Sequence, residues 1–448
     1  MALPLPPDPA QWQAVLADAS RDRLSPAAHW YFSGQWIALD PQQQPSPPIW
    51  LVAPQLRCRQ RLQAEPLAIR QLDSSAVTPL ALVPALASNP TFINQDTLRY
   101  LARHPLRIRS ELNAGQADEP ARARSLWPED WRIEATAALL ADDWHRFVLK
   151  GESGAQQPFC CQRLWQRDEQ TDRDQSSPRW AIGVMLNGAQ GDDDEAHGGH
   201  FALTLGRWRD DGDIADWLVA NFYNPDVVSE KGILPALVPM DNYLTDINSG
   251  QQQYRPSWLV ACDVADEQIA SALYVQLLTT LERLYDHRVQ YQHTDNNCTG
   301  LSMDALRAAG IQVPCRGASS HLLAPLLFTS TLLRERSWRE ARKASRYLLA
   351  EQTRLLPWQA FEACVEHLLG LLRGSRTAGT EIEHRLISST RAVYGLHFPQ
   401  LPSARAWGRE PAVSLFDYQR RVPPKRADWK IIPVPARELP AELKRTSP

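Results

Sequence analysis

The run that begins at His200 constrains the fold most strongly, because every second residue from 201 to 205 is large and apolar. This period of two predicts a half-buried strand, with His200 on the face opposite those apolar residues. The pair Asp211-Gly212 is a turn signal, and a second apolar run over 217–223 returns from it. The sequence therefore predicts an antiparallel hairpin that carries a histidine at its start.

A second reactive group lies at the predicted start of a helix. Residues 298–309 place apolar side chains at helical spacing, and a glycine suited to the end of a helix follows them. Asn296 or Asn297 is the predicted N-cap. Cys298 then falls in the first turn, where unpaired N–H groups and the helix dipole stabilise a thiolate. Cys298 is thus a candidate nucleophile, and His200 is a candidate base.

These residues also have simpler interpretations. A cysteine often only fills space in a core. The acidic run 192–195, with His197 and His200, suggests a divalent metal, but consecutive carboxylates do not converge on one point and are typical of a solvated loop. We therefore predict no metal site and no cofactor. A side chain from Asn221 or Asn224 is predicted to orient the imidazole, as the third member of a catalytic triad does.

The motifs resemble those of the DUF4105 family of circularly permuted papain-like (NlpC/P60-type) proteins, which includes a bacterial lipoprotein N-acyltransferase. In that family a Gly-His-aromatic strand comes first, an Asn-Tyr/Phe strand second and an Asn-Cys helix start last. This chain has Gly199-His200-Phe201, Asn221-Phe222-Tyr223 and Asn297-Cys298 in the same order. The resemblance extends from about residue 180 to residue 314.

The resemblance implies that Cys298 is the nucleophile, His200 the general base and acid, and Asn221 the orienting residue. Backbone N–H groups at the helix start, including that of Cys298, would form an oxyanion hole. The expected function is a thiol hydrolase or acyltransferase that attacks an amide or ester carbonyl of a peptide, a lipid or a small acyl substrate and forms a thioester. The alternative is a catalytically silent binding or scaffold protein with the same fold. Further candidates for contact with the substrate or the oxyanion are Asn297, Asn224, Tyr291, Trp208 and Trp217.

The length of 448 residues exceeds one ordinary domain, so we predict an α+β protein of several parts. They are a mixed N-terminal domain over 1–175, the permuted papain-like domain over 180–315, a helical region over 318–397 and a proline-rich extended tail over 398–448.

The net charge and the cysteine content limit the possible binding partners and the cellular location. A net charge of −3 gives no electrostatic case for nucleic acid or for an anionic membrane. The most basic segment, 334–346, also contains two glutamates and is typical of a solvated helix face. Seven cysteines show no disulfide or zinc spacing, and no signal peptide or membrane-spanning run is visible. We therefore predict a cytoplasmic protein without an integral membrane segment.

Overall fold

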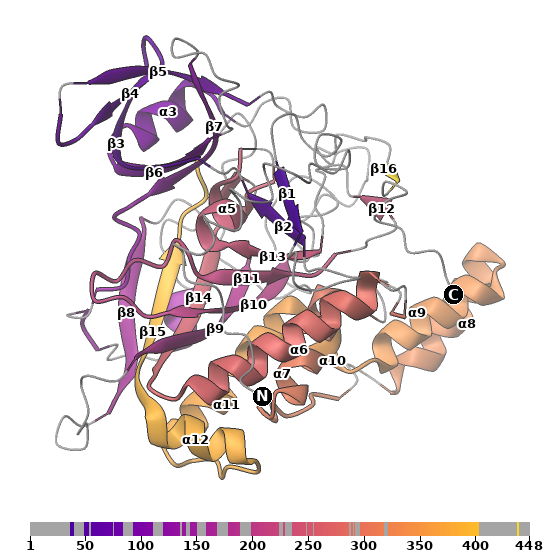
Figure 1. The fold of residues 1–448 in the computed structure, drawn as a ribbon. Helices are drawn as coiled ribbons and strands as arrows, with labels where there is room; N and C mark the ends of the chain where they lie inside the picture. The colour runs from indigo at the N-terminus through magenta and orange to yellow at the C-terminus, as the bar shows by residue number, and fades with distance from the viewer. Residues whose placement is uncertain are drawn as a thin grey trace.

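The computed structural model shows an α+β protein built around a seven-stranded sheet and a closed five-stranded barrel (Figure 1). Asn224, His197, the acidic run 192–195 and most of the predicted tail lie outside the residues that the structure describes. Those residues are 36–39, 49–52, 55–74, 76–83, 93–110, 120–134, 137–139, 144–149, 158–167, 178–188, 199–223, 227–228, 235–247, 249–253, 255–285, 288–289, 291, 296–317, 321–402 and 437–438.

The seven strands are all antiparallel, in the order β13-β11-β10-β9-β14-β15-β8. The predicted hairpin is confirmed, because β10 pairs with β11 and Gly212 in the connection has a φ of 70°. A positive φ is strained for most residues, which explains a glycine there. In chain order the strands are β8 (Cys160–Gln166), β9 (Trp180–Asn187), β10 (His200–Arg207), β11 (Leu218–Asn221), β13 (Ala236–Pro239), β14 (Ser257–Val264) and β15 (Thr390–Phe398).

Helices cover one face of this sheet. The apolar side chains that alternate along β10, from Phe201 to Leu205, join a core cluster with α6 (Glu267–Tyr285), α7 (Cys298–Ala308) and α11 (Pro357–Leu372). The predicted helix that Cys298 opens is confirmed. The larger side chains of the period-two pattern lie under the helices, but the prediction of a half-buried strand is wrong, because the residues between them, such as Ala202 and Thr204, are buried as well.

The barrel covers the other face. It joins β3 (Gln55–Gln63), β4 (Ala68–Gln71), β5 (Val77–Leu82), β7 (Ala121–Pro128) and β6 (Pro105–Ser110) in a closed ring, with α3 (Gln95–Leu101) between β5 and β6 in the chain. Barrel residues such as Leu106 and sheet residues such as Met185 belong to one apolar cluster, together with the short helix α5 (Met240–Thr245). The barrel is thus packed directly on the sheet.

Buried ion pairs also join the barrel to the segment around α5. Arg107 and Arg109 of β6 both bond the Asp241 carboxylate, at 2.9 Å and 2.7 Å. Arg124 of β7 bonds Asp246 at 2.6 Å, and the two side chains are only 1% and 0% exposed. These arginines neutralise carboxylates that would otherwise be buried with an uncompensated charge.

The sheet crosses the domain boundaries expected from the sequence. Strand β8 comes from the predicted N-terminal domain, and β15 comes from the region predicted to be helical, yet both pair within the sheet that holds His200. The reason is that β15 fills the edge of β14, a pairing between segments far apart in the chain. Residues 180–315 therefore do not form a separate unit.

The remaining elements belong neither to the seven-stranded sheet nor to the barrel. No helix of the described ranges is both long enough and apolar enough to cross a membrane. These elements are β1 (Trp36–Leu39), β2 (Ile49–Val52), β12 (Val227–Val228), β16 (Arg437–Glu438), α4 (Trp144–Leu149), η3 (Gln251–Gln253), α8 (Leu323–Glu335), α9 (Trp338–Leu349), α10 (Gln352–Leu355) and α12 (Glu381–Ser389).

Candidate active site

Cys298 is the first residue of α7, as predicted, and Asn297 is its N-cap. The Asn297 side-chain oxygen accepts a hydrogen bond from the Gly300 N–H at 2.9 Å, and its NH₂ group donates to the Leu355 carbonyl at 2.9 Å. Both ends of this amide are therefore occupied. We predicted Asn297 as a contact for the substrate or the oxyanion, but its contacts show that it fixes the start of α7 against the end of α10.

His200 is the first residue of β10, at the end of the strand that the start of α7 approaches. The imidazole and the Cys298 thiol interact, and the pKa of the thiol is about 6. Burial alone would raise this pKa, but the charge of His200 lowers it, and hydrogen bonds from the Phe201 backbone and the Thr299 hydroxyl lower it further. The structure thus brings together the two predicted residues, although 98 positions separate them in the sequence.

The pKa values of the other six cysteines are shifted in the opposite direction. Burial raises the pKa of Cys160 and Cys161 to about 11 and that of Cys364 to about 12. The pKa of Cys262 is raised further for the same reason, and the pKa values of Cys58 and Cys315 are also raised. All seven lie in described segments and all are free thiols. Cys298 is therefore the one cysteine whose surroundings favour the thiolate.

Tyr291, a predicted candidate for contact with the substrate or the oxyanion, lies beside Cys298. Its hydroxyl accepts a hydrogen bond from the backbone N–H of Cys298 at 3.2 Å, and its ring stacks on that of Tyr223, with centroids 5.7 Å apart. The N–H expected to contribute to an oxyanion hole thus already bonds an oxygen atom. Tyr223 was not predicted, although it belongs to the Asn-Phe-Tyr motif from which Asn221 was chosen.

A row of buried polar side chains crosses the sheet next to His200. Asn187 of β9 is directly opposite His200 in the strand register, and Ser257 of β14 is opposite Asn187. The Asn187 amide donates to the Ser257 hydroxyl at 2.7 Å and accepts from the Tyr243 hydroxyl. Tyr243 belongs to α5, and its ring centroid is 6.4 Å from that of His200.

This polar row was missed in the sequence. Asn187 ends an apolar run and Tyr243 follows no recognisable motif, so only the strand register reveals that they adjoin the histidine. Burial raises the pKa of Tyr243, so its hydroxyl stays protonated and donates to Asn187. The groups next to His200 in this row are therefore neutral and hydrogen-bonded to one another.

The third member of the predicted triad is not established by these contacts. Asn221 ends β11 and is buried, but the structure has no hydrogen bond between Asn221 and His200, both of which it describes. Nε2 of His200 is buried and has no conventional hydrogen-bond partner among the described residues. Asn224, the alternative, lies outside them.

Trp208 and Trp217 were predicted wrongly as pocket residues. They lie beyond the opposite end of β10, where Arg207 pairs with Trp180, roughly 23 Å along the strand from His200. Trp208 packs between Trp217 and Tyr394, and the Trp217 N–H donates to the Arg207 carbonyl at 3.0 Å. The two tryptophans were chosen because they are close to His200 in the sequence. An extended strand of eight residues nevertheless places its two ends far apart in space.

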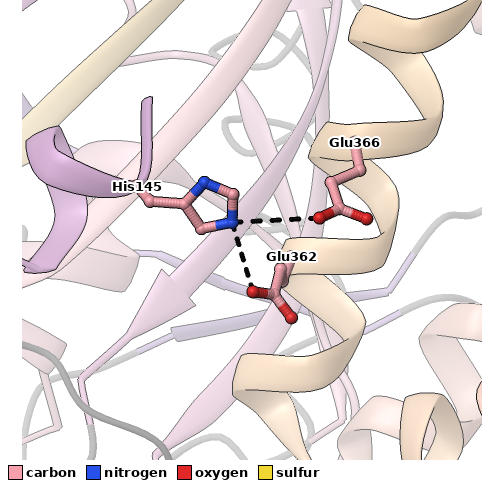
Figure 2. Close-up of side chains that lie close together, drawn as sticks. All are labelled: His145, Glu362 and Glu366. Carbon is pink, nitrogen blue, oxygen red and sulfur yellow. Dashed lines mark hydrogen bonds and ion pairs between the residues drawn. The ribbon is translucent and has the colours of Figure 1, made fainter. Parts of the chain in front are cut away.

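Within the part of the chain that the structure describes, one group of three possible metal ligands comes together: His145, Glu362 and Glu366, whose ligand atoms lie within 4.8 Å of one another (Figure 2). Arg316, however, bonds both carboxylates, that of Glu366 at 2.9 Å. Because a guanidinium already bonds both carboxylates, the cluster is an ion-pair junction. It fastens α4 and α11 to the segment that follows α7.

Replacing Asn297 by alanine is expected to lower the free energy of unfolding by about 2–3 kcal/mol, because the helix loses its cap and the buried Leu355 carbonyl loses its donor. Asn94 is a matched control, since it caps α3 with bonds to two backbone N–H groups and its alanine variant should lose only about 1 kcal/mol. Urea denaturation measures both. Equal losses would contradict the role of the bond to Leu355.

Comparison of the chain with protein-family models, with curated proteins and with solved structures gives no match.

Proposed function

We propose that the protein is a cysteine-dependent hydrolase or acyltransferase, and that its sheet and α7 form a permuted papain-like site of the DUF4105 kind. The observation that carries the proposal is the position of Cys298 at the start of α7 beside His200 at the start of β10, where the imidazole lowers the pKa of the buried thiol to about 6. A cysteine that only fills a core has the opposite shift, as Cys262 and Cys364 do in this chain.

The proposed reaction begins with attack of the Cys298 thiolate on the carbonyl carbon of an amide or ester. The carbon–sulfur bond forms while the carbonyl π electrons move onto oxygen. The carbonyl then re-forms as the carbon–nitrogen or carbon–oxygen bond to the leaving group breaks, and His200 gives its proton to the departing amine or alcohol. The resulting thioester is then attacked by water or an amine, whose proton returns to His200, and the thiolate leaves. Water as the acceptor gives hydrolysis, and an amine gives acyl transfer.

The oxyanion would be held at the start of α7. The Cys298 N–H points toward an oxygen atom in the present structure, that of Tyr291, at 3.2 Å. A substrate oxygen that takes the place of this hydroxyl would receive the same hydrogen bond and the positive end of the helix dipole. Substrate binding then requires the Tyr291 side chain to move.

The test is the pH profile of thiol alkylation by iodoacetamide, with each cysteine followed separately by mass spectrometry. Labelling of Cys298 is expected to rise with a midpoint near pH 6 and to level off above it, because the thiolate is the reactive form. The other six cysteines serve as internal controls and should remain largely unlabelled at pH 7. Cys298 that reacts only in alkaline solution, like its neighbours, would favour the catalytically silent scaffold instead.

A further inference from the structure

The helices α8 and α9 form a hairpin that projects from the body of the protein (Figure 1). The hairpin spans residues 322–349, and Arg336 at its turn has a left-handed φ of 50°. The basic segment 334–346, expected to form one helix face, is thus broken at Arg336, and the leucine-rich α8 packs against the arginine-rich α9.

One face of α8 exposes large apolar side chains. Leu322, Leu326 and Leu333 are 86%, 66% and 75% exposed, and their spacing of four and seven residues puts them on one side of the helix. Trp338, at the start of α9, is 65% exposed. With Leu323 and Leu349, the hairpin holds six of the nine large hydrophobic residues that are exposed in the described segments. Single exposed leucines are ordinary, but a concentration on one projecting element indicates a binding surface.

The second helix adds positive charge. Arg339, Arg342, Lys343 and Arg346 repeat at the spacing of one helix face, while Ala341 on the other side is fully buried. Residues 334–346 contain six cations and two carboxylates, in a chain whose net charge is −3. Of these cations only Arg334 forms an ion pair with a described carboxylate, that of Glu335.

We infer that the α8–α9 hairpin binds the surface of a membrane that contains anionic lipids. The leucine stripe would enter the boundary between headgroups and acyl chains, the arginines and the lysine would contact lipid phosphates, and Trp338 would lie at the interface that tryptophan favours. The hairpin would lie in the plane of the membrane, since a helix of 13 residues spans only about 20 Å.

The charges and the exposed leucines favour an anionic membrane over a second copy of the chain and over a nucleic acid. A second copy seated symmetrically on the same face would bring its own six cations against these six, which is repulsive. A nucleic acid would satisfy the cations but would leave the leucine stripe in water. Anionic lipid is the partner that offers both a phosphate layer and an apolar layer. The inference does not depend on chemistry at Cys298.

The test is flotation of the full-length protein with vesicles of phosphatidylcholine, with and without phosphatidylglycerol. Binding is expected only to the anionic vesicles and should weaken as salt is added. The variant Arg339→Gln/Arg342→Gln/Arg346→Gln should lower the partition coefficient by about 10- to 100-fold. The variant Leu326→Gln/Leu333→Gln should lower it by at least about tenfold.

The matched controls are exposed residues elsewhere on the chain, Val77→Gln/Leu139→Gln for the leucines and Arg103→Gln/Arg122→Gln for the arginines. They should bind as the wild type does. Circular dichroism and the alkylation profile of Cys298 report whether each variant is folded. No binding to anionic vesicles, or equal loss in controls and hairpin variants, would overturn the inference. Sedimentation showing a dimer that the leucine variant abolishes would overturn it in favour of a second copy.

Discussion

Replacing His200 by alanine is expected to move the midpoint of Cys298 alkylation from near pH 6 to above about pH 8.5. His200 supplies the attraction that overcomes burial, and without it burial raises the pKa of the thiol instead. The rate at pH 6.5 should fall by about tenfold, less than the loss of thiolate, because a thiolate of higher pKa is the stronger nucleophile. The midpoint is therefore the decisive measurement.

His367→Ala is the control for loss of an imidazole. His367 is buried as deeply as His200, but it bonds Glu383 at 2.7 Å in the helical layer. Its loss should lower stability and leave the midpoint of Cys298 labelling unchanged. If His200→Ala retained a midpoint near 6, the start of α7 alone would account for the low pKa, and the Cys298–His200 dyad would be rejected.

The largest expected effect on stability is that of Arg124→Ala, which should lower the free energy of unfolding by about 3–5 kcal/mol. The change leaves the Asp246 carboxylate buried at 0% exposure without its guanidinium. Since the free energy of unfolding of a native protein is only about 5–15 kcal/mol, this change would remove a large part of it. Thermal and urea denaturation measure the change.

Arg122→Ala is the matched control, because Arg122 lies two residues earlier on the same strand but is exposed. It should change stability by no more than about 0.5 kcal/mol. The double variant Arg124→Met/Asp246→Leu should recover part of the loss, since it removes both charges, although Ser249 also loses an acceptor. If Arg124→Ala were as stable as Arg122→Ala, the barrel would not depend on this ion pair.

The parts predicted correctly from the sequence are those that local patterns encode. Alternation of apolar residues predicted β10, the glycine turn predicted its hairpin with β11, and an asparagine before the cysteine predicted the start of α7. Each signal is contained within about ten residues, so no knowledge of the rest of the chain was needed.

The barrel was not predicted because its strands look polar. Arg107, Arg109 and Arg124 alternate with apolar residues in β6 and β7, a pattern that normally marks a solvent-exposed face. They are buried here because their carboxylate partners come from Asp216, Asp241 and Asp246, more than a hundred positions later. Burial of an arginine depends on such a partner, which a local pattern cannot reveal.

Of the residues at the candidate site, the sequence predicted Cys298, His200 and Tyr291. Asn187 and Tyr243 became visible through the register of β9 with β10 and through the position of α5, both of which are long-range features. The net charge of −3 is a property of the whole chain and does not describe the basic face of α9, which is a local feature.

The pairing of β14 with β15 has a consequence for how the protein is made. Cys298 and His200 leave the ribosome well before residues 390–398, yet β14 keeps an open apolar edge until that last strand arrives. The nascent chain therefore carries its complete reactive pair in an unfinished sheet, a state prone to aggregation and open to chaperones. A gene fragment that stops after α7 would encode both Cys298 and His200 but would lack the strand that covers the edge of β14.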